Sequence, residues 1–98
     1  MSEPITVIAR VRAKAGQEAR LCQELQRLLA PTRVEAGCID YDLHQSQTDP
    51  ALFVFYENWK SQADLDAHFE TPHLKAVLKL VPELLDGPMD LSTWTKVK

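Results

Sequence analysis

The 98 residues include 14 acidic and 11 basic side chains, which gives a formal net charge of −3, and 45% of the residues are apolar. A chain of this length supports one hydrophobic core, so we expect residues 1–98 to form a single domain of ordinary globular composition rather than a disordered segment. The basic residues are scattered instead of forming a concentrated patch, which argues against nucleic acid as a partner.

The N-terminal third predicts a strand followed by a helix. Residues 5–13 place apolar side chains on one face at a period of two, which is typical of a half-buried strand, and these are Ile5, Val7, Ala9, Val11 and Ala13. Gly16 ends this strand. An amphipathic helix is predicted next and should stop at Pro31 or soon after it; its apolar stripe is Leu21, Leu25, Leu28 and Leu29.

The middle of the chain predicts a hairpin. After Gly37, the apolar residues Ile39, Tyr41 and Leu43 alternate with Asp40, Asp42 and His44. A turn at residues 48–50 leads into the aromatic segment 52–59, which we expect to be the partner strand. One parity of that strand holds Phe53, Phe55, Glu57 and Trp59, and the other holds Leu52, Val54, Tyr56 and Asn58.

Two short helical segments and a last strand complete the chain. Ser61 is predicted to cap a helix that carries Leu65 and Phe69 on one face and that Pro72 interrupts. Thr71-Pro72 is typical of a second helix start, and the helix that follows should close at Pro82 and at the Gly87-Pro88 pair. Residues 90–98 alternate weakly and predict a final strand.

This order, β-α-β-β-α-β, predicts an α+β ferredoxin-like fold with an antiparallel sheet and helices on one face. The second strand of the hairpin has large apolar side chains on both parities, so the other face of the sheet also needs cover. A second copy of the chain packed sheet on sheet would supply it, which predicts a homodimer. The alternative is a monomer with a few exposed apolar side chains, which is common in soluble proteins.

The sequence contains neither a membrane-span pattern nor a disulfide pattern. Its longest uninterrupted apolar stretches are only a few residues, and the N-terminus lacks the charged-then-apolar order of a signal peptide. We therefore expect a cytoplasmic protein with no membrane partner. Cys22 and Cys38 have no metal-type spacing, and we interpret both as reduced, small apolar residues.

Several segments in order resemble the antibiotic biosynthesis monooxygenase family: ITVIARVRAKAGQE, EAGCIDYDLH, FYENW, AHFETPHLKA and the late GP pair. The resemblance covers nearly the whole chain and rests on the ordered set rather than on any one piece. It implies a dimeric α+β barrel, with a pocket in each subunit between the sheet and the helices. It also implies oxidation of quinols, anthrones or similar aromatics by molecular oxygen, without flavin, haem or metal.

Three residues are predicted to be catalytic. His68 matches the histidine of the family's AH-x-x-x-PH stretch, and an imidazole beside the core side of its helix suits removal of a phenolic proton near neutral pH. Trp59 matches a pocket tryptophan of several family branches, where an indole stacks on a flat ring. Glu57 shares the parity of Trp59 and could orient His68 or a substrate hydroxyl. The alternatives are a capping histidine, a core tryptophan and a surface carboxylate.

Five further residues are candidates for contacting the substrate: Leu65, Phe69, His73, Tyr56 and Asn58. The last two have the opposite parity to Trp59, so they should face a partner subunit or solvent unless the strand end twists. No metal site is predicted, because His73 follows His68 by five residues instead of the four that align two ligands on a helix. His44 is interpreted as a surface or interface residue.

The predicted function is cofactor-independent oxidation of a quinol-like or polycyclic phenolic substrate. Three alternatives stay open. For haem degradation within the same fold, the resemblance implies an asparagine on the first strand together with a tryptophan and a histidine; Trp59 and His68 fit, but the only asparagine of this chain is Asn58. An isomerase of a small phosphorylated signal needs cationic pocket residues, for which Arg10 and Arg12 are the nearest candidates. A non-catalytic dimeric ligand-binding or stress-response module needs none of these groups.

Overall fold

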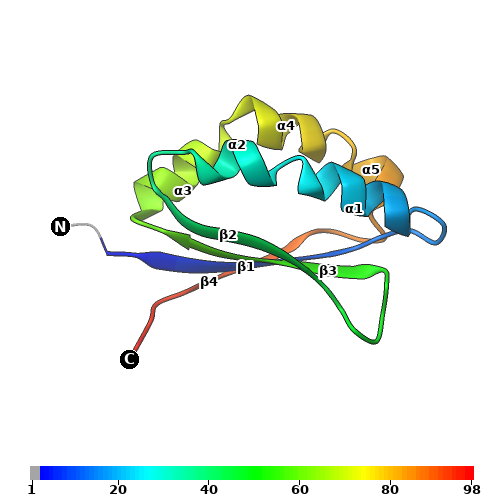
Figure 1. Ribbon diagram of the computed structural model, residues 1–98, viewed down its shortest axis with the longest axis horizontal. Helices are drawn as coiled ribbons and strands as arrows, with labels where there is room; N and C mark the ends of the chain where they lie inside the picture. The colour runs from blue at the N-terminus through cyan, green and yellow to red at the C-terminus, as the bar shows by residue number, and fades with distance from the viewer. Residues whose placement is uncertain (1–2) are drawn as a thin grey trace.

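The computed structural model describes residues 3–98, and it has a four-stranded antiparallel sheet covered by helices on one face (Figure 1). The strand order is β2-β3-β1-β4. The elements in chain order are β1 Ile5–Arg12, α1 Glu18–Gln26, α2 Leu29–Arg33, β2 Cys38–Gln45, β3 Leu52–Trp59, α3 Gln62–Phe69, α4 Pro72–Leu78, α5 Val81–Leu84 and β4 Asp90–Trp94. The predicted ferredoxin-like α+β fold is confirmed. The first predicted helix divides into α1 and α2, and the helix predicted to begin at Thr71-Pro72 divides into α4 and α5.

The two central strands, β1 and β3, follow the predicted alternation. Apart from the half-buried Ile5, the helix-facing side chains of both strands are buried, and they are Val7, Ala9, Val11, Phe53, Phe55, Glu57 and Trp59. Val7 pairs with Glu57 and Ala9 pairs with Phe55 across the sheet, so the two buried rows lie side by side. The row on β3 thereby places one carboxyl group among apolar side chains.

Strand β2 departs from the predicted alternation at its start. Tyr41 is buried as expected, but Ile39, predicted to lie on the same face, is 50% exposed. The register between β2 and β3 shifts between Cys38 and Asp40. Ile39 therefore has no partner opposite it on β3, and the bulge turns its side chain away from the core.

Capping side chains begin both α3 and α4, and the chain bends between the two helices at Thr71. Ser61 Oγ accepts a hydrogen bond from the backbone N–H of Asp64 at 3.2 Å, and Thr71 Oγ1 accepts one from the N–H of Leu74 at 3.4 Å, as predicted. Helix α4 ends at Leu78, and Pro82 lies inside α5 instead of closing the preceding helix. Proline is compatible with that position because the first N–H groups of a helix have no intrahelical partner.

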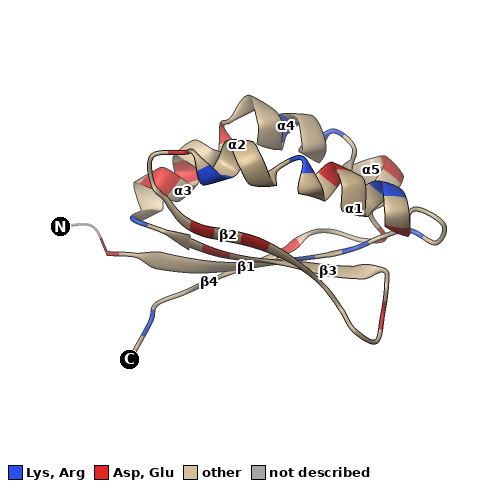
Figure 2. Ribbon diagram, viewed as in Figure 1, with Lys and Arg blue, Asp and Glu red and all other residues tan. Residues whose placement is uncertain are grey.

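Within residues 3–98, no segment covers the face of the sheet opposite the helices, as Figure 1 shows. Tyr56 is 43% exposed and Trp94 is 55% exposed. Figure 2 shows acidic and basic positions interspersed along the helices and strands. Among residues 3–98, no helix combines the length and the apolar character needed to cross a membrane.

Candidate active site

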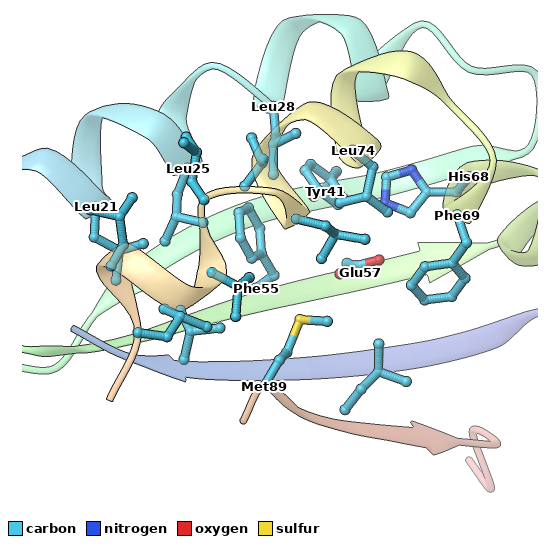
Figure 3. Close-up of a pocket in the computed structure, with 18 residues that line it drawn as sticks. Leu21, Leu25, Leu28, Tyr41, Phe55, Glu57, His68, Phe69, Leu74 and Met89 are labelled. Atoms are coloured by element: carbon cyan, nitrogen blue, oxygen red, sulfur yellow. The ribbon is translucent and has the colours of Figure 1, made fainter. Parts of the chain in front are cut away.

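A cavity of about 50 Å³ lies between the helices and the sheet (Figure 3). Its wall is almost entirely apolar, and neither lysine nor arginine is among the residues that line it. The ionisable lining groups are Tyr41, Glu57 and His68. The other lining residues are Val11, Leu21, Leu25, Leu28, Phe55, Phe69, Leu74, Val77, Leu78, Leu80, Val81, Leu84, Leu85, Met89 and Leu91.

His68 lies in the last turn of α3 and borders this cavity together with Phe69, whose ring centroid is 5.8 Å from that of the imidazole (Figure 3). Its side chain is 3% exposed. The imidazole packs on Trp59 with ring centroids 4.7 Å apart and meets Tyr41 edge-on at 5.5 Å. The ring is therefore held in place by aromatic neighbours while it still borders the cavity.

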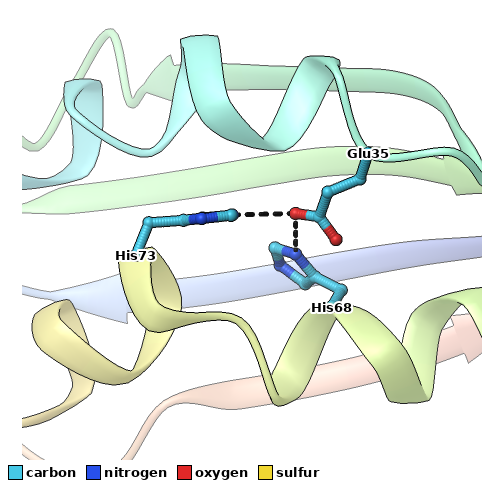
Figure 4. A group of neighbouring side chains, drawn as sticks. All are labelled: Glu35, His68 and His73. Carbon is cyan, nitrogen blue, oxygen red and sulfur yellow. Dashed lines mark hydrogen bonds and ion pairs between the residues drawn. The ribbon is translucent and has the colours of Figure 1, made fainter.

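Glu35, in the loop between α2 and β2, fixes the orientation of this imidazole. Its Oε2 lies 2.9 Å from His68 Nδ1 and 2.8 Å from His73 Nε2 (Figure 4). A carboxylate can only accept hydrogen bonds, so the proton of His68 is placed on Nδ1. Nε2 is then the unprotonated nitrogen, and because Glu35 is not part of the cavity lining, Nε2 is the nitrogen left for a ligand.

The electrostatic environment keeps His68 neutral. Burial lowers the pKa of His68 below its ordinary value, because a charged imidazole is poorly solvated there, and the hydrogen bond and negative charge of Glu35 act in the opposite direction. A neutral imidazole with a free Nε2 can accept a proton. The arrangement of a carboxylate behind a histidine is the one used by many general bases.

Glu57 is the second polar group of the cavity, and it is 4% exposed. Its Oε1 accepts a hydrogen bond from Trp59 Nε1 at 2.8 Å. Burial raises the pKa of Glu57 to about 7; the hydrogen bond from Trp59 opposes this shift and the charge of Glu35 adds to it. Near neutral pH the group can therefore donate or accept a proton.

This raised pKa predicts a pH-dependent stability. The pKa of Glu57 is about 7 in the folded chain against an ordinary value of 4.5, so its stabilising contribution is complete below about pH 4.5 and is lost as the pH rises through 7. Over that interval the free energy of unfolding should fall by at most about 1.4 kcal/mol per pH unit. Glu57→Gln should remove this slope, as urea unfolding at several pH values would measure.

Glu35, Tyr41 and Cys38 interact electrostatically with Glu57, and all three remain in the Glu57→Gln variant. Any slope that they cause should persist in both proteins. Parallel pH profiles of stability for the wild type and Glu57→Gln would show that Glu57 does not titrate in this range.

Four other predicted site residues, Phe69, Trp59, Leu65 and His73, lie on the helix side of the sheet. Phe69 lines the cavity. Trp59 and Leu65 are 0% and 1% exposed and lie behind the lining, so Trp59 supports His68 and Glu57 without forming the cavity wall. His73 contacts Glu35 and is likewise outside the lining.

Tyr56 and Asn58 point to the opposite face of the sheet, as expected from the parity of their strand. Asn58 Oδ1 accepts a hydrogen bond from Thr6 Oγ1 at 2.6 Å, and its Nδ2 donates to Asp40 Oδ2 at 3.0 Å. Neither Tyr56 nor Asn58 lines the cavity that His68 borders, and a substrate contact by either residue stays a prediction.

Two other groups bear on the chemistry that the site can carry. Burial raises the pKa of Tyr41 well above its ordinary value, so its hydroxyl stays protonated. Cys22 and Cys38 are free thiols, and burial raises the pKa of Cys38 to about 11, which makes it a poor nucleophile.

The ligand atoms of Glu35, His68 and His73 lie within 4.8 Å of one another, so these three residues could hold a metal ion.

Comparison with known proteins identifies relatives over nearly the whole chain. The family model described as "Antibiotic biosynthesis monooxygenase" matches residues 4–80. A Mycobacterium tuberculosis protein named "Putative monooxygenase Rv0793" is 36% identical over 91% of this chain and 87% of its own length. An Escherichia coli protein named "Probable quinol monooxygenase YgiN" is 31% identical over 79% of this chain and 84% of its own length.

A solved structure has the same fold as this chain. The crystal structure of PA3566 from Pseudomonas aeruginosa superposes with a TM-score of 0.94 at 37% identity, covering 100% of this chain and 98% of that one. The chain spans 63% of the length of a further relative, an uncharacterized Synechocystis protein that is 30% identical over 94% of this chain. The fold and the sequence thus point to the same group of proteins.

Proposed function

Because the chain belongs to the antibiotic biosynthesis monooxygenase family, we propose that it is a monooxygenase that oxidises an uncharged quinol-like or polycyclic phenolic substrate with molecular oxygen, without flavin, haem or metal. The observation that carries this proposal is an otherwise apolar cavity lined by His68 and Glu57, in which Glu35 holds the His68 imidazole through Nδ1 and leaves Nε2 free. The names of relatives described as monooxygenases support the same reaction class.

The chemistry that this site would perform begins with the removal of a phenolic proton by His68 Nε2. Deprotonation makes an electron-rich ring a much better one-electron donor to oxygen. One oxygen atom then enters the ring and the other leaves as water, and the substrate supplies all the electrons, so no external reductant is needed. Glu57 in its protonated form can donate a hydrogen bond to the oxyanion that develops.

The size of the cavity limits how a substrate enters. An apolar cavity of about 150 Å³ is large enough for benzene, whereas this one is about 50 Å³. A bicyclic substrate therefore requires the cover over the cavity to move outward. The short helices α4 and α5 are suited to such movement, because several of their cavity-facing residues are only partly buried, namely Val77, Leu78 and Val81.

The alternative activities fit the cavity less well. A phosphorylated substrate would meet Glu57 with no lysine or arginine among the lining residues, and Arg10 and Arg12 are exposed at positions of β1 that face away from the helices. The first strand, β1, carries no asparagine for haem degradation, and Asn58 on β3 points away from the cavity.

Oxygen uptake by flavin-free and metal-free protein tests the proposal. With a panel of reduced naphthoquinones and anthrones, we expect saturable oxygen consumption for at least one member and none with phosphorylated sugars. Tight binding of several panel members under argon, without oxygen uptake in air, would instead identify a non-catalytic ligand-binding module. Turnover that needs added flavin or iron would contradict the cofactor-independent reaction.

We also propose that two copies pair through the open face of the sheet, which carries Ile8, Val54, Tyr56 and Trp94 on neighbouring strands. Burial of exposed aromatic side chains between two sheets is favourable. Sedimentation should give twice the mass of one chain, and Tyr56→Asp should shift the equilibrium toward monomer. Val34→Asp, at a loop position that is 83% exposed, should leave the mass unchanged. A monomeric wild type at all concentrations would rule out this pairing.

A further inference from the structure

We propose that Glu35, His68 and His73 form a binding site for a divalent transition-metal ion such as Zn²⁺, and that the bound ion switches off the base at His68. Binding of the ion does not depend on the proposed function. Inactivation of the base rests on the proposed function, because it needs His68 Nε2 to be the proton acceptor. Binding and inactivation are tested by separate measurements.

The geometry places three suitable ligand atoms around one point. Glu35 Oε2 lies 2.9 Å from His68 Nδ1 and 2.8 Å from His73 Nε2, and all three atoms lie within 4.8 Å of one another (Figure 4). In a tetrahedral zinc site with bonds of about 2.0–2.1 Å, neighbouring ligand atoms are roughly 3.3 Å apart. The nitrogen–oxygen pairs therefore need to separate by about half an ångström to admit an ion.

The chain brings these ligands together from two regions that are far apart in the sequence. Glu35 lies in the loop before β2, His68 ends α3, and His73 follows Pro72 in the first turn of α4. The bend capped by Thr71 turns His73 back toward His68, although the five-residue spacing would separate them on one continuous helix. The four-residue spacing that aligns two ligands on one continuous helix is therefore not required across this bend.

The donor set and its surroundings determine which ions suit the site. Two imidazole nitrogens and one carboxylate oxygen bind Zn²⁺, Ni²⁺, Cu²⁺ and Fe²⁺ well, whereas Mg²⁺ prefers oxygen ligands. The His68 side chain is 3% exposed, while those of Glu35 and His73 are 15% and 22% exposed. An ion can therefore reach the site from the solvent side, and three protein ligands leave a coordination position for water.

A bound ion would change the tautomer of His68. In the metal-free chain, Glu35 holds the proton on Nδ1 and leaves Nε2 unprotonated toward the cavity. An ion on Nδ1 displaces that proton, so the single N–H of the neutral imidazole must then be on Nε2. Nε2 becomes a hydrogen-bond donor toward the cavity and can no longer accept a proton from a substrate.

Calorimetric titration of metal-stripped protein with ZnCl₂ tests the binding site. We expect one equivalent to bind to the wild type, and His73→Gln and Glu35→Gln to weaken binding by more than about 100-fold, since even losing an outer-shell partner costs roughly 10- to 100-fold. His44→Gln is the matched control, because His44 is exposed on β2, and it should bind as the wild type does. MgCl₂ should give no binding heat.

Two further measurements separate binding from folding and from function. Zn²⁺ should raise the thermal midpoint of the wild type and of His44→Gln but not that of His73→Gln, with circular dichroism showing that each variant is folded. Zn²⁺ should also abolish oxygen uptake in the wild type, and a chelator should restore it.

The outcomes that would overturn the proposal are distinct. Absence of zinc binding by the wild type, or equal binding by folded His73→Gln, would eliminate the site. Zinc binding that leaves oxygen uptake unchanged would eliminate the switch and keep the site. Absence of oxygen uptake in the metal-free protein would contradict the proposed function, and with it the switch, while the titration still decides the site.

Discussion

Replacement of His68 by Ala is expected to lower the turnover of a quinol substrate by roughly 10²-fold, the lower end of the range for loss of a general base. The reason is that His68 lines the cavity and Nε2 is its unprotonated nitrogen, with the tautomer fixed by Glu35. Steady-state oxygen uptake should show the loss in kcat rather than in KM alone, because proton removal occurs in the reacting complex.

Two variants keep this test separate from a general loss of structure. His68 packs on Trp59, so unfolding midpoints must accompany the rates, and His68→Gln retains more of the side-chain volume without restoring the base. His44→Ala removes an exposed histidine and should turn over like the wild type. Equal rates for folded His68→Ala and His44→Ala would show that His68 is not the base.

Replacement of Trp59 by Ala should have the largest effect on stability, a loss of about 3–5 kcal/mol in the free energy of unfolding. Trp59 is 0% exposed, and its ring contacts both Tyr41 and His68. The substitution opens a large cavity in the core. It also removes the N–H that donates to Glu57 Oε1, which leaves a buried carboxyl group without that partner.

Chemical denaturation of the wild type and three variants would measure this effect. Trp59→Phe keeps an aromatic ring but loses the N–H, so it should fall between the wild type and Trp59→Ala. Val34→Ala, at a position that is 83% exposed, should change stability by no more than about 0.5 kcal/mol. If Trp59→Ala proved as mild as Val34→Ala, the indole would not support the site as described.

The sequence predicts most of the fold because local patterns determine most of it. The period of two in β1 and β3 identifies the buried rows, and Ser61 and Thr71 begin helices at the predicted positions. Ile39 departs from the pattern because a register shift at the start of β2 depends on the pairing with β3. Pro82 does not close α4 because the chain leaves that helix earlier and begins α5.

The candidate site is only partly predictable from the sequence, because its contacts join distant segments. Strand parity and helix spacing place Glu57 and His68 on core-facing positions, and both line the cavity. Glu35 has no periodic signal, and it lies 33 residues from His68 along the chain. The only hint is an acidic residue just before the turn at Gly37. The position of His73 depends on the bend at Thr71, which spacing rules for a single helix do not describe.

Anaerobic titration of a reduced naphthoquinone into metal-free protein, followed by its absorption spectrum, most directly tests whether the cavity removes a phenolic proton at His68. We expect the ligand bound to the wild type to show the phenolate spectrum at a pH where the free ligand is neutral, and the ligand bound to His68→Ala to stay neutral. A neutral ligand in the wild type, or equal ionisation in both proteins, would contradict the proposed role of His68.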